Sequence, residues 1–313
     1  MKPDPVKPAP LTDDVLVEAL AFVKAANPFV EYTWGWETGR FIDFRWAGNN
    51  VLRRADDALF FEKHCTLLRR GDNLVGLIVA EYGRDDHCIL TQSEDPATVD
   101  WAVQWLLDRR DGQRLTLYPS DEATWVHEVL EGHGFARGDV AEMGWGFDLG
   151  DVPDPFEPEG FVVEPIRGPE DFAGIDRCLS MAFGRELGRE AVLESLAGNP
   201  VFLPELSVVA RAANGDVAAY CRGTVDANTG VGSIDPVATR PDYQRRGLGK
   251  AVVLRCFDEQ RRHGGTMSFI GSGPRGSDGS QLYEKLNPAS ITSYSEWAPR
   301  ELPATSRQSP AGI

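Results

Sequence analysis

The strongest constraint on the fold is the heptapeptide QRRGLGK at residues 244–250. It follows an apolar, β-branched stretch at 231–239 that predicts a strand, and it opens a stretch at 247–264 with helical spacing of apolar residues. The first turn of a helix has main-chain N–H groups without partners, and the helix dipole adds partial positive charge there. The two glycines allow close approach to this main chain, and the two arginines and the lysine add formal positive charge. The heptapeptide therefore predicts a pyrophosphate site at a strand-to-helix junction.

The patterns around this junction alternate between strand and helix in the order β-α-α-β-β-β-α-β-α-β. Strands are expected at 161–166, 206–212, 216–225, 231–239, 266–272 and 290–298, and helices at 169–183, 188–198, 247–264 and 277–287. The N-terminal half repeats the later part of this order more weakly, with a hairpin at 64–82, strands at 87–92, 114–120 and 142–149, and helices at 98–110 and 123–135. The repeat indicates an α/β fold, a mixed sheet flanked by helices, with internal duplication.

The segment LGDVPDPFEPEG at 149–160 is rich in proline and acidic residues and lacks periodicity, which is typical of a linker. We therefore expect two domains, which suits a chain of 313 residues. The expected limits are a flexible N-terminus at 1–10, a first domain at 11–150, a linker at 151–160, a second domain at 161–302 and a loose tail at 303–313.

The chain is acidic, with a formal net charge of -16. Such a surface disfavours binding to nucleic acid or anionic membrane and mildly favours cationic partners. The opening MKPDPVKPAP lacks the apolar core of a signal peptide, so a cytoplasmic location is expected. The five cysteines contain no CxxC and the five histidines show no ligand spacing, so neither a disulfide framework nor a metal site is predicted.

The stretch VATRPDYQRRGLG at 237–249 resembles the Gln/Arg-x-x-Gly-x-Gly/Ala signature of the GNAT superfamily of N-acetyltransferases, and LYEKLN at 282–287 resembles a second signature of that family. The resemblance covers residues 161–299 and, more faintly, the first unit. It implies two tandem GNAT-like acyl-CoA N-acyltransferase folds that use acetyl-CoA as cosubstrate. In such a fold the amides of the heptapeptide bind the pyrophosphate, and the main chain at 237–238 pairs with the pantetheine arm. The implied cofactor-binding residues are Val237, Ala238, Gln244, Arg245, Arg246, Gly247, Leu248, Gly249 and Lys250.

The resemblance also implies a catalytic acid. Tyr283 matches a family tyrosine whose hydroxyl protonates the leaving thiolate, although a lone tyrosine on an amphipathic helix is otherwise a core-edge residue. The neighbourhood departs from the family pattern, because Gly276 and Gly279 stand where the family has asparagine and alanine, and Asn287-Pro288 replaces Gly-Phe.

A base is needed because a primary amine, with a pKa near 10.4, is mostly protonated at neutral pH. In the GNAT family a carboxylate on the fourth strand often removes the proton through a water, and Asp235 is the candidate here. Alternation along the strand would place it on one face with Ser233 and Val237. A turn or capping role is nearly as good an interpretation of Asp235, and Asp226 is the next candidate base.

The first unit is predicted to be a degenerate copy without an acetyl-CoA site. Leu130 stands at the position of Tyr283, and Glu94 and Asp95 replace the glycine-rich basic turn, where they would repel pyrophosphate. Its aromatic run at 31–46, which contains Trp34, Trp36, Phe41, Phe44 and Trp46, suits a core and could also form a wall for a bulky or cationic substrate.

The sequence therefore predicts an N-acetyltransferase that transfers acetyl directly to an amine of a small molecule or peptide, in a monomer or homodimer. Two alternatives remain open. One is transfer of another acyl group or acetylation of an amine like that handled by mycothiol synthases, which are tandem proteins of similar size. The other is a non-catalytic acyl-CoA-binding or scaffolding protein.

Overall fold

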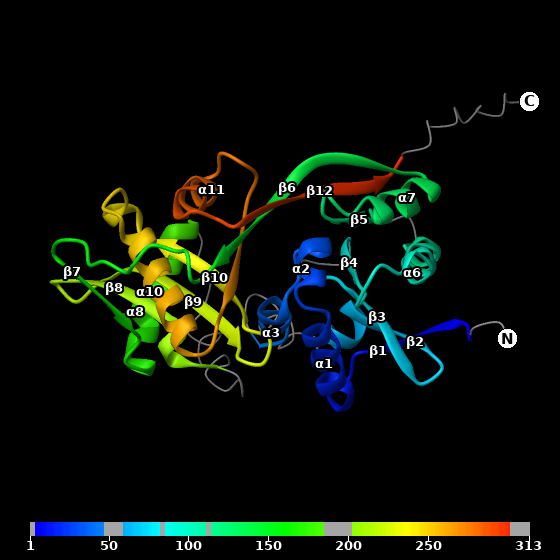
Figure 1. Cartoon of the computed structure of the whole chain (residues 1–313), viewed down its shortest axis with the longest axis horizontal. Helices are drawn as coiled ribbons and strands as arrows, with labels where there is room; N and C mark the ends of the chain where they lie inside the picture. The colour runs from blue at the N-terminus through cyan, green and yellow to red at the C-terminus, as the bar shows by residue number, and fades with distance from the viewer. Residues whose placement is uncertain (1–3, 47–58, 82–84, 111–113, 185–201, 301–313) are drawn as a thin grey trace, which may run out of the picture.

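The computed structural model describes residues 4–46, 59–81, 85–110, 114–184 and 202–300. The helix expected at 188–198 and the tail expected at 303–313 lie outside these ranges. Twelve strands form one mixed sheet in the order β1-β2-β3-β4-β5-β12-β6-β11-β10-β9-β8-β7 (Figure 1). The strands are β1 Val6–Pro10, β2 Cys65–Arg70, β3 Asn73–Val79, β4 Asp86–Leu90, β5 Thr116–Leu117, β6 Phe135–Asp148, β7 Phe161–Pro165, β8 Ser207–Ala212, β9 Val217–Asp226, β10 Val231–Thr239, β11 Met267–Ser272 and β12 Ser290–Pro299. The helices are α1 Leu16–Ala26, α2 Phe29–Trp34, α3 Thr38–Trp46, α5 Phe60–His64, α6 Pro96–Arg109, α7 Thr124–Gly132, α8 Phe172–Phe183, α10 Leu248–Arg262 and α11 Asp278–Tyr283.

The two halves of the chain exchange strands. β6 comes from the N-terminal half, yet its end pairs with β11 of the C-terminal half, from Met143–Ser272 to Asp148–Met267. β12 comes from the C-terminal half and pairs with β6 along most of its length, while Trp297 also pairs with Leu117 of β5. Figure 1 shows these two long strands running side by side from one half to the other. Each half of the sheet therefore contains a strand that the other half supplies.

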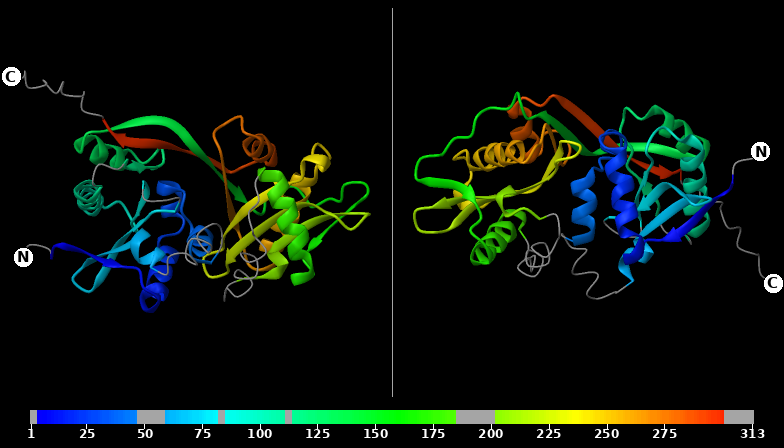
Figure 2. Two further views of the ribbon diagram at one scale, coloured as in Figure 1. Left: turned by 180° about the vertical axis from the view of Figure 1, so that it is seen from behind. Right: turned by 60° about the horizontal axis from the view of Figure 1, so that its bottom comes forward.

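Helices cover both faces of the C-terminal part of the sheet, with α10 on one face and α8 on the other (Figure 2). The α10 side contains one apolar cluster, in which the rings of Phe147 and Phe257 lie 5.0 Å apart. The α8 side contains a second cluster that includes Ile175, and the N-terminal half has a third, larger one. A fully buried side chain of this size contributes about 1.5–3 kcal/mol to folding. The apolar spacing of both helices is thus explained by burial against the sheet.

The observed positions of β1 and β6 correct two expectations from the sequence. Residues 6–10 were expected to be flexible but form β1, which pairs antiparallel with the outer edge of β2 from Val6–Arg70 to Pro10–Thr66. The strand expected at 142–149 begins seven residues earlier, at Phe135, because its first part pairs with β12 at the other end of the chain. No helix within the described residues is both long and apolar enough to cross a membrane.

β10 separates from its neighbour β11 partway along its length. The two strands run parallel and pair only from Val231–Met267 to Ser233–Phe269. On its other edge β10 has a bulge, since Ile234 pairs with Gly223 and Val237 pairs with Cys221. A bulge inserts one extra residue and bends the strand, which accounts for the divergence. The sheet therefore has a V-shaped opening between β10 and β11 after Ser233.

The bulge also changes which side chains share a face. Regular alternation would have put Ser233, Asp235 and Val237 on one face, but the inserted residue reverses the alternation. Ser233 and Asp235 line one cavity, whereas Val237 packs against the cluster on the α10 side. The expectation that Val237 shares a face with the other two is therefore wrong.

Candidate active site

The heptapeptide forms an exposed turn that leads into α10. Arg245 and Gly247 both have a left-handed main chain, with φ of 64° and 79°. Among the described residues, none accepts a hydrogen bond from the main-chain N–H groups of Arg245 to Lys250, and the first helical bond is donated by Ala251 to Gly247 at 3.0 Å. Consecutive N–H groups in such a turn form a concave anion site, and the helix dipole adds to it.

The side chains of the turn add positive charge to this site. Arg245 and Arg246 are exposed and form no ion pair with another described residue, and the Arg246 guanidinium lies 5.5 Å from the ring centroid of Tyr243. Arg240 just upstream is different, because it is buried and pairs with Asp216 at 3.2 Å and Asp242 at 2.7 Å. The charge available to an anion therefore comes from the turn itself.

The main chain of β10 is open toward the V-shaped gap. The N–H of Arg240 donates to Ala218 of β9 at 2.9 Å, which fixes the alternation of the antiparallel ladder. By that alternation the main-chain N–H and C=O of Ala238 face β9, and those of Val237 face the gap. Val237 is thus the residue in this pair whose main chain could add a ligand as an extra strand. Gln244 lies at the mouth of the gap, where its side chain amide is 3.4 Å from the carbonyl oxygen of Thr239.

Tyr283 lies at the end of α11 with 5% of its surface exposed, and its ring meets that of Trp145 edge-on at 6.4 Å. Burial raises the pKa of its hydroxyl, and the negative charge of Asp235 raises it further. The hydroxyl therefore keeps its proton at neutral pH. Asp235 is exposed at the bulge of β10 and faces the cavity described next. Asp226, in contrast, is buried at the end of β9 and pairs with Lys24 at 3.5 Å.

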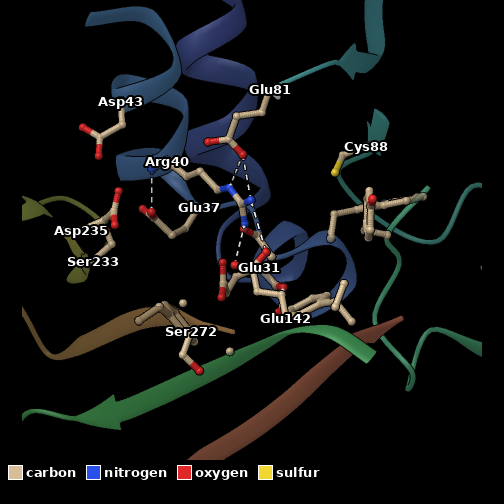
Figure 3. Close-up of a pocket in the computed structure, with 18 of the residues that line it drawn as sticks. Glu31, Glu37, Arg40, Asp43, Glu81, Cys88, Glu142, Ser233, Asp235 and Ser272 are labelled. Atoms are coloured by element: carbon tan, nitrogen blue, oxygen red, sulfur yellow. Dashed lines mark hydrogen bonds and ion pairs between the residues drawn. The ribbon is translucent and has the colours of Figure 1, made fainter. Parts of the chain in front are cut away.

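A cavity of about 470 Å³ begins at the bulge of β10 and extends between the two halves of the chain (Figure 3). The C-terminal half contributes Ser233 and Asp235, and β6 contributes Glu142. The N-terminal half contributes the segment around α2 and α3, including Glu31 and Arg40. A volume in this range suits a small molecule or the end of a chain.

Close packing fixes α3 beside the bulge. A Cβ on Gly39 would lie 2.1 Å from the Ser233 hydroxyl oxygen and 2.2 Å from that of Thr224, so only glycine allows this approach. An ion pair between Asp43 of α3 and Arg222 of β9 holds the same contact, and the arginine is 5% exposed. A paired charge at this depth depends strongly on its partner. The position of the N-terminal half against the bulge is therefore well defined.

The cavity is strongly acidic. The described residues that line it carry seven carboxyl groups and one guanidinium, that of Arg40. Arg40 pairs with Glu81 at 2.8 Å and with Glu142 at 3.3 Å, and donates to the Gly35 carbonyl at 2.6 Å. Figure 3 shows Arg40 in the middle of this group. A single arginine cannot neutralise so many carboxylates.

The electrostatic cost of burying carboxylates close together is most evident at Glu31, which is 6% exposed. Burial and the nearby charge of Glu37 raise its pKa to about 8, although Arg40 acts in the opposite direction. No described residue forms an ion pair with the Glu31 carboxylate, and the Tyr294 hydroxyl donates to its main-chain carbonyl at 2.7 Å. Burial likewise raises the pKa of Glu37 and Glu81. The cavity therefore holds several carboxyl groups that a cation would stabilise in the ionised form.

The corresponding helix start in the N-terminal half is built differently. Asp95 caps α6 by accepting hydrogen bonds from the Thr98 N–H at 3.0 Å and the Thr98 hydroxyl at 2.6 Å. The carboxylate thus takes the place that an anion would need. Leu130 is fully buried on α7. These contacts support the prediction that this half has no acetyl-CoA site, and Glu94 beside the cap adds a further negative charge.

The sequence interpretation named Asp235 but missed the other acids of this cavity. It singled out the aromatic residues of 31–46, of which Trp34, Trp36, Phe41 and Phe44 are indeed buried, and Trp34 also lines the cavity. The side chain of Trp46 lies outside the described part. The available signal was the acids within that stretch, because carboxylates among so many large apolar residues must be buried or line a cavity.

Residues 177–286 match the Acetyltransferase (GNAT) family, a range that contains the heptapeptide, Asp235 and Tyr283. The C-terminal half therefore contains a GNAT acetyltransferase domain. Proteins of this class generally use an acyl-CoA donor, which supports an acyl-CoA-dependent acyltransferase.

Solved structures share the fold of the whole chain. A GCN5-related N-acetyltransferase from Sphaerobacter thermophilus is similar with a TM-score of 0.60 and 17% identity over 95% of this chain and 96% of that one. A tandem GNAT protein from the clavulanic acid biosynthesis pathway is similar with a TM-score of 0.60 and 13% identity over 94% and 98%. A GCN5-related N-acetyltransferase from Kribbella flavida is similar with a TM-score of 0.52 and 18% identity, over 73% of this chain and 88% of that one. The comparison with curated proteins gives no match. The mixed α/β fold of tandem GNAT type, inferred from the sequence, is confirmed.

Proposed function

We propose that the protein is an N-acetyltransferase that transfers acetyl from acetyl-CoA to the amine of a small molecule in the cavity between its halves. The observation that carries this proposal is the row of main-chain amides from Arg245 to Lys250, which donate to no residue that the structure describes, beside the gap between β10 and β11. The pyrophosphate would bind these amides, and the pantetheine arm would lie along Val237 with the thioester directed toward the bulge.

The acceptor cavity opens at that bulge, which supports direct transfer without an acyl-enzyme. In this step the amine nitrogen forms a bond to the thioester carbonyl carbon, and the carbon–sulfur bond breaks. Before the attack, Asp235 accepts one proton from the ammonium, directly or through a water, and passes it to solvent. Tyr283 gives a proton to the departing thiolate, because burial keeps its hydroxyl protonated. The nitrogen loses its second proton as the tetrahedral adduct breaks down, and that proton restores the hydroxyl of Tyr283.

Calorimetry with coenzyme A and acetyl-CoA tests the donor site. We expect one molecule bound per full-length chain, and at least about tenfold weaker binding by Arg246→Glu, because one charged contact to phosphate is worth at least ~1.4 kcal/mol. Arg177→Glu is the matched control, since this arginine is exposed on α8 in the same half. Absence of binding to the wild type would refute the proposal, and two molecules per chain would refute the prediction for the N-terminal half.

Turnover separates the enzyme from a binding module. Thiol release from acetyl-CoA in the presence of a panel of amines is expected for the transferase. Tight binding of acetyl-CoA without thiol release for any amine would instead favour an acyl-CoA-binding protein, and faster release from propionyl-CoA or succinyl-CoA would reassign the acyl group.

A further inference from the structure

Among the described residues that line the acceptor cavity, seven carboxyl groups stand against the single guanidinium of Arg40. Arg40 and Arg222 form the ion pairs of Glu81, Glu142 and Asp43. The other four lining carboxyl groups form no ion pair with a described residue: Glu31, Glu37, Asp86 and Asp235. Glu37 is occupied as a cap, since it accepts from the Arg40 main-chain N–H at 2.6 Å. Glu31 has no comparable role and faces the cavity (Figure 3).

The buried Glu31 carboxyl is a second sign of a ligand. The residue is 6% exposed, and no described residue forms an ion pair with it. A hydrogen bond from Tyr294 and the charge of Arg40 favour its ionised form, but burial and Glu37 outweigh them and raise its pKa to about 8. Buried carboxylates are normally paired, because removing an ion from water is costly. A positive charge supplied by a bound molecule would complete the arrangement.

The acids of the cavity lie at different distances from the gap between β10 and β11. In the view of Figure 3, Asp235 and Ser233 lie at one end, Glu31 and Glu142 lie in the middle, and Cys88 lies toward the other end. Asp235 is the group next to the gap between β10 and β11, where the proposed function puts the reacting amine. Glu31 and Glu142 are displaced from that gap, so they can bind a charge that does not react.

We propose, on the basis of the proposed function, that the acceptor is an amine with at least two positive charges, one of which reacts at Asp235 while another is held by Glu31. The chemical class is a small di- or polyamine, either an aliphatic chain or an aminated ring. The cavity volume of about 470 Å³ admits such a molecule. The N-terminal half then acts as the part that determines specificity, because it supplies Glu31, Glu37, Asp43, Glu81 and Asp86.

The test compares 1,4-diaminobutane with 1-aminobutane, which differ by one ammonium group, using the full-length protein and saturating acetyl-CoA. We expect the KM for the diamine to be at least about tenfold lower, the equivalent of ~1.4 kcal/mol. Glu31→Gln should remove this difference by raising the KM for the diamine alone, with little change in kcat. Glu131→Gln, at an exposed acid on α7, is the control and should behave as the wild type.

A second variant and two binding probes make the test of the diamine proposal independent of one substitution. Glu142→Gln is a second variant with the same expectation, because this acid lines the same cavity and its side chain is 31% exposed. Calorimetry of 1,4-diaminobutane with the protein alone reports binding without turnover, and 2-deoxystreptamine as a second probe distinguishes an aminated ring from an aliphatic chain. Equal KM values for diamine and monoamine, or an equal effect of Glu31→Gln on both, would overturn the inference while acetyl-CoA binding still supported the proposed function. Failure to bind acetyl-CoA would instead refute the proposed function.

Discussion

Replacing Glu31 by glutamine should make the protein more stable, and increasingly so as the pH rises. The two side chains have the same shape, but only glutamate can ionise. The groups that face the Glu31 carboxyl are Glu37 before α3, Arg40 on α3, Glu142 on β6 and Tyr294 on β12. Burial and the two glutamates oppose ionisation, and Arg40 and Tyr294 favour it, with a net rise of the pKa to about 8.

The size and sign of the effect follow from that value. In the unfolded chain a glutamate has a pKa of about 4.3, so between pH 4.3 and 8 the folded state holds this proton more tightly than the unfolded state. The free energy of unfolding therefore falls as the pH rises through this window, by about 1.4 kcal/mol per pH unit for one proton. The full difference is about 5 kcal/mol above pH 8, and it vanishes below about pH 4. Glu31→Gln removes this contribution.

Urea unfolding at pH 5, 6, 7 and 8 measures the prediction directly. We expect the stability of Glu31→Gln minus that of the wild type to grow across the series, to about 4 kcal/mol at pH 7. Glu131→Gln should differ from the wild type by the same small amount at every pH. A difference between Glu31→Gln and the wild type that stays constant from pH 5 to pH 8 would refute the reasoning, because it would mean that Glu31 titrates alike in both states.

Two further changes test the catalytic acid and the contact between the halves. Tyr283→Phe should lower kcat at saturating acetyl-CoA by about a hundredfold, as expected for loss of a general acid, with little change in acetyl-CoA binding; an unchanged maximal rate would remove Tyr283 from the mechanism. Asp43→Asn should cost about 3 kcal/mol of stability in urea unfolding at pH 8, where Asp43 is ionised although burial raises its pKa to about 7, because the buried Arg222 is left without its partner. The double variant Asp43→Asn, Arg222→Met should recover most of that loss, and a single variant as stable as the wild type would contradict the buried pair.

Local patterns were sufficient for most of the elements that the structure describes. Strands such as 231–239 and the helix after the heptapeptide were predicted almost to the residue, because burial on one face imposes a regular spacing. The bulge in β10 was not predictable in this way. It depends on how Ile234 and Val237 pair with β9, and single-sequence periodicity assumes that no residue is inserted.

The cavity between the two halves could not be derived from the sequence for a different reason. Its walls come from α2, α3, β6, β10 and β11, which lie far apart in the chain and meet only when the sheet is complete. The pattern at 142–149 predicted a strand but not its neighbours, because alternation specifies the buried face and not the pairing partner. The heptapeptide could be proposed as a site from the sequence alone because its main-chain amides and basic side chains all belong to one continuous turn.

The exchange of β6 and β12 between the halves has a consequence for folding while the chain is being synthesised. β6 is bordered on both sides by strands that leave the ribosome long after it, and β5, which pairs with β4 on one edge, receives its second neighbour only from the last described strand of the chain. The nascent first half therefore presents an unfinished strand edge until translation is nearly complete, a state that invites pairing with other chains. Cutting the gene at the proline-rich segment would make this edge permanent, so each half expressed alone should be prone to aggregate.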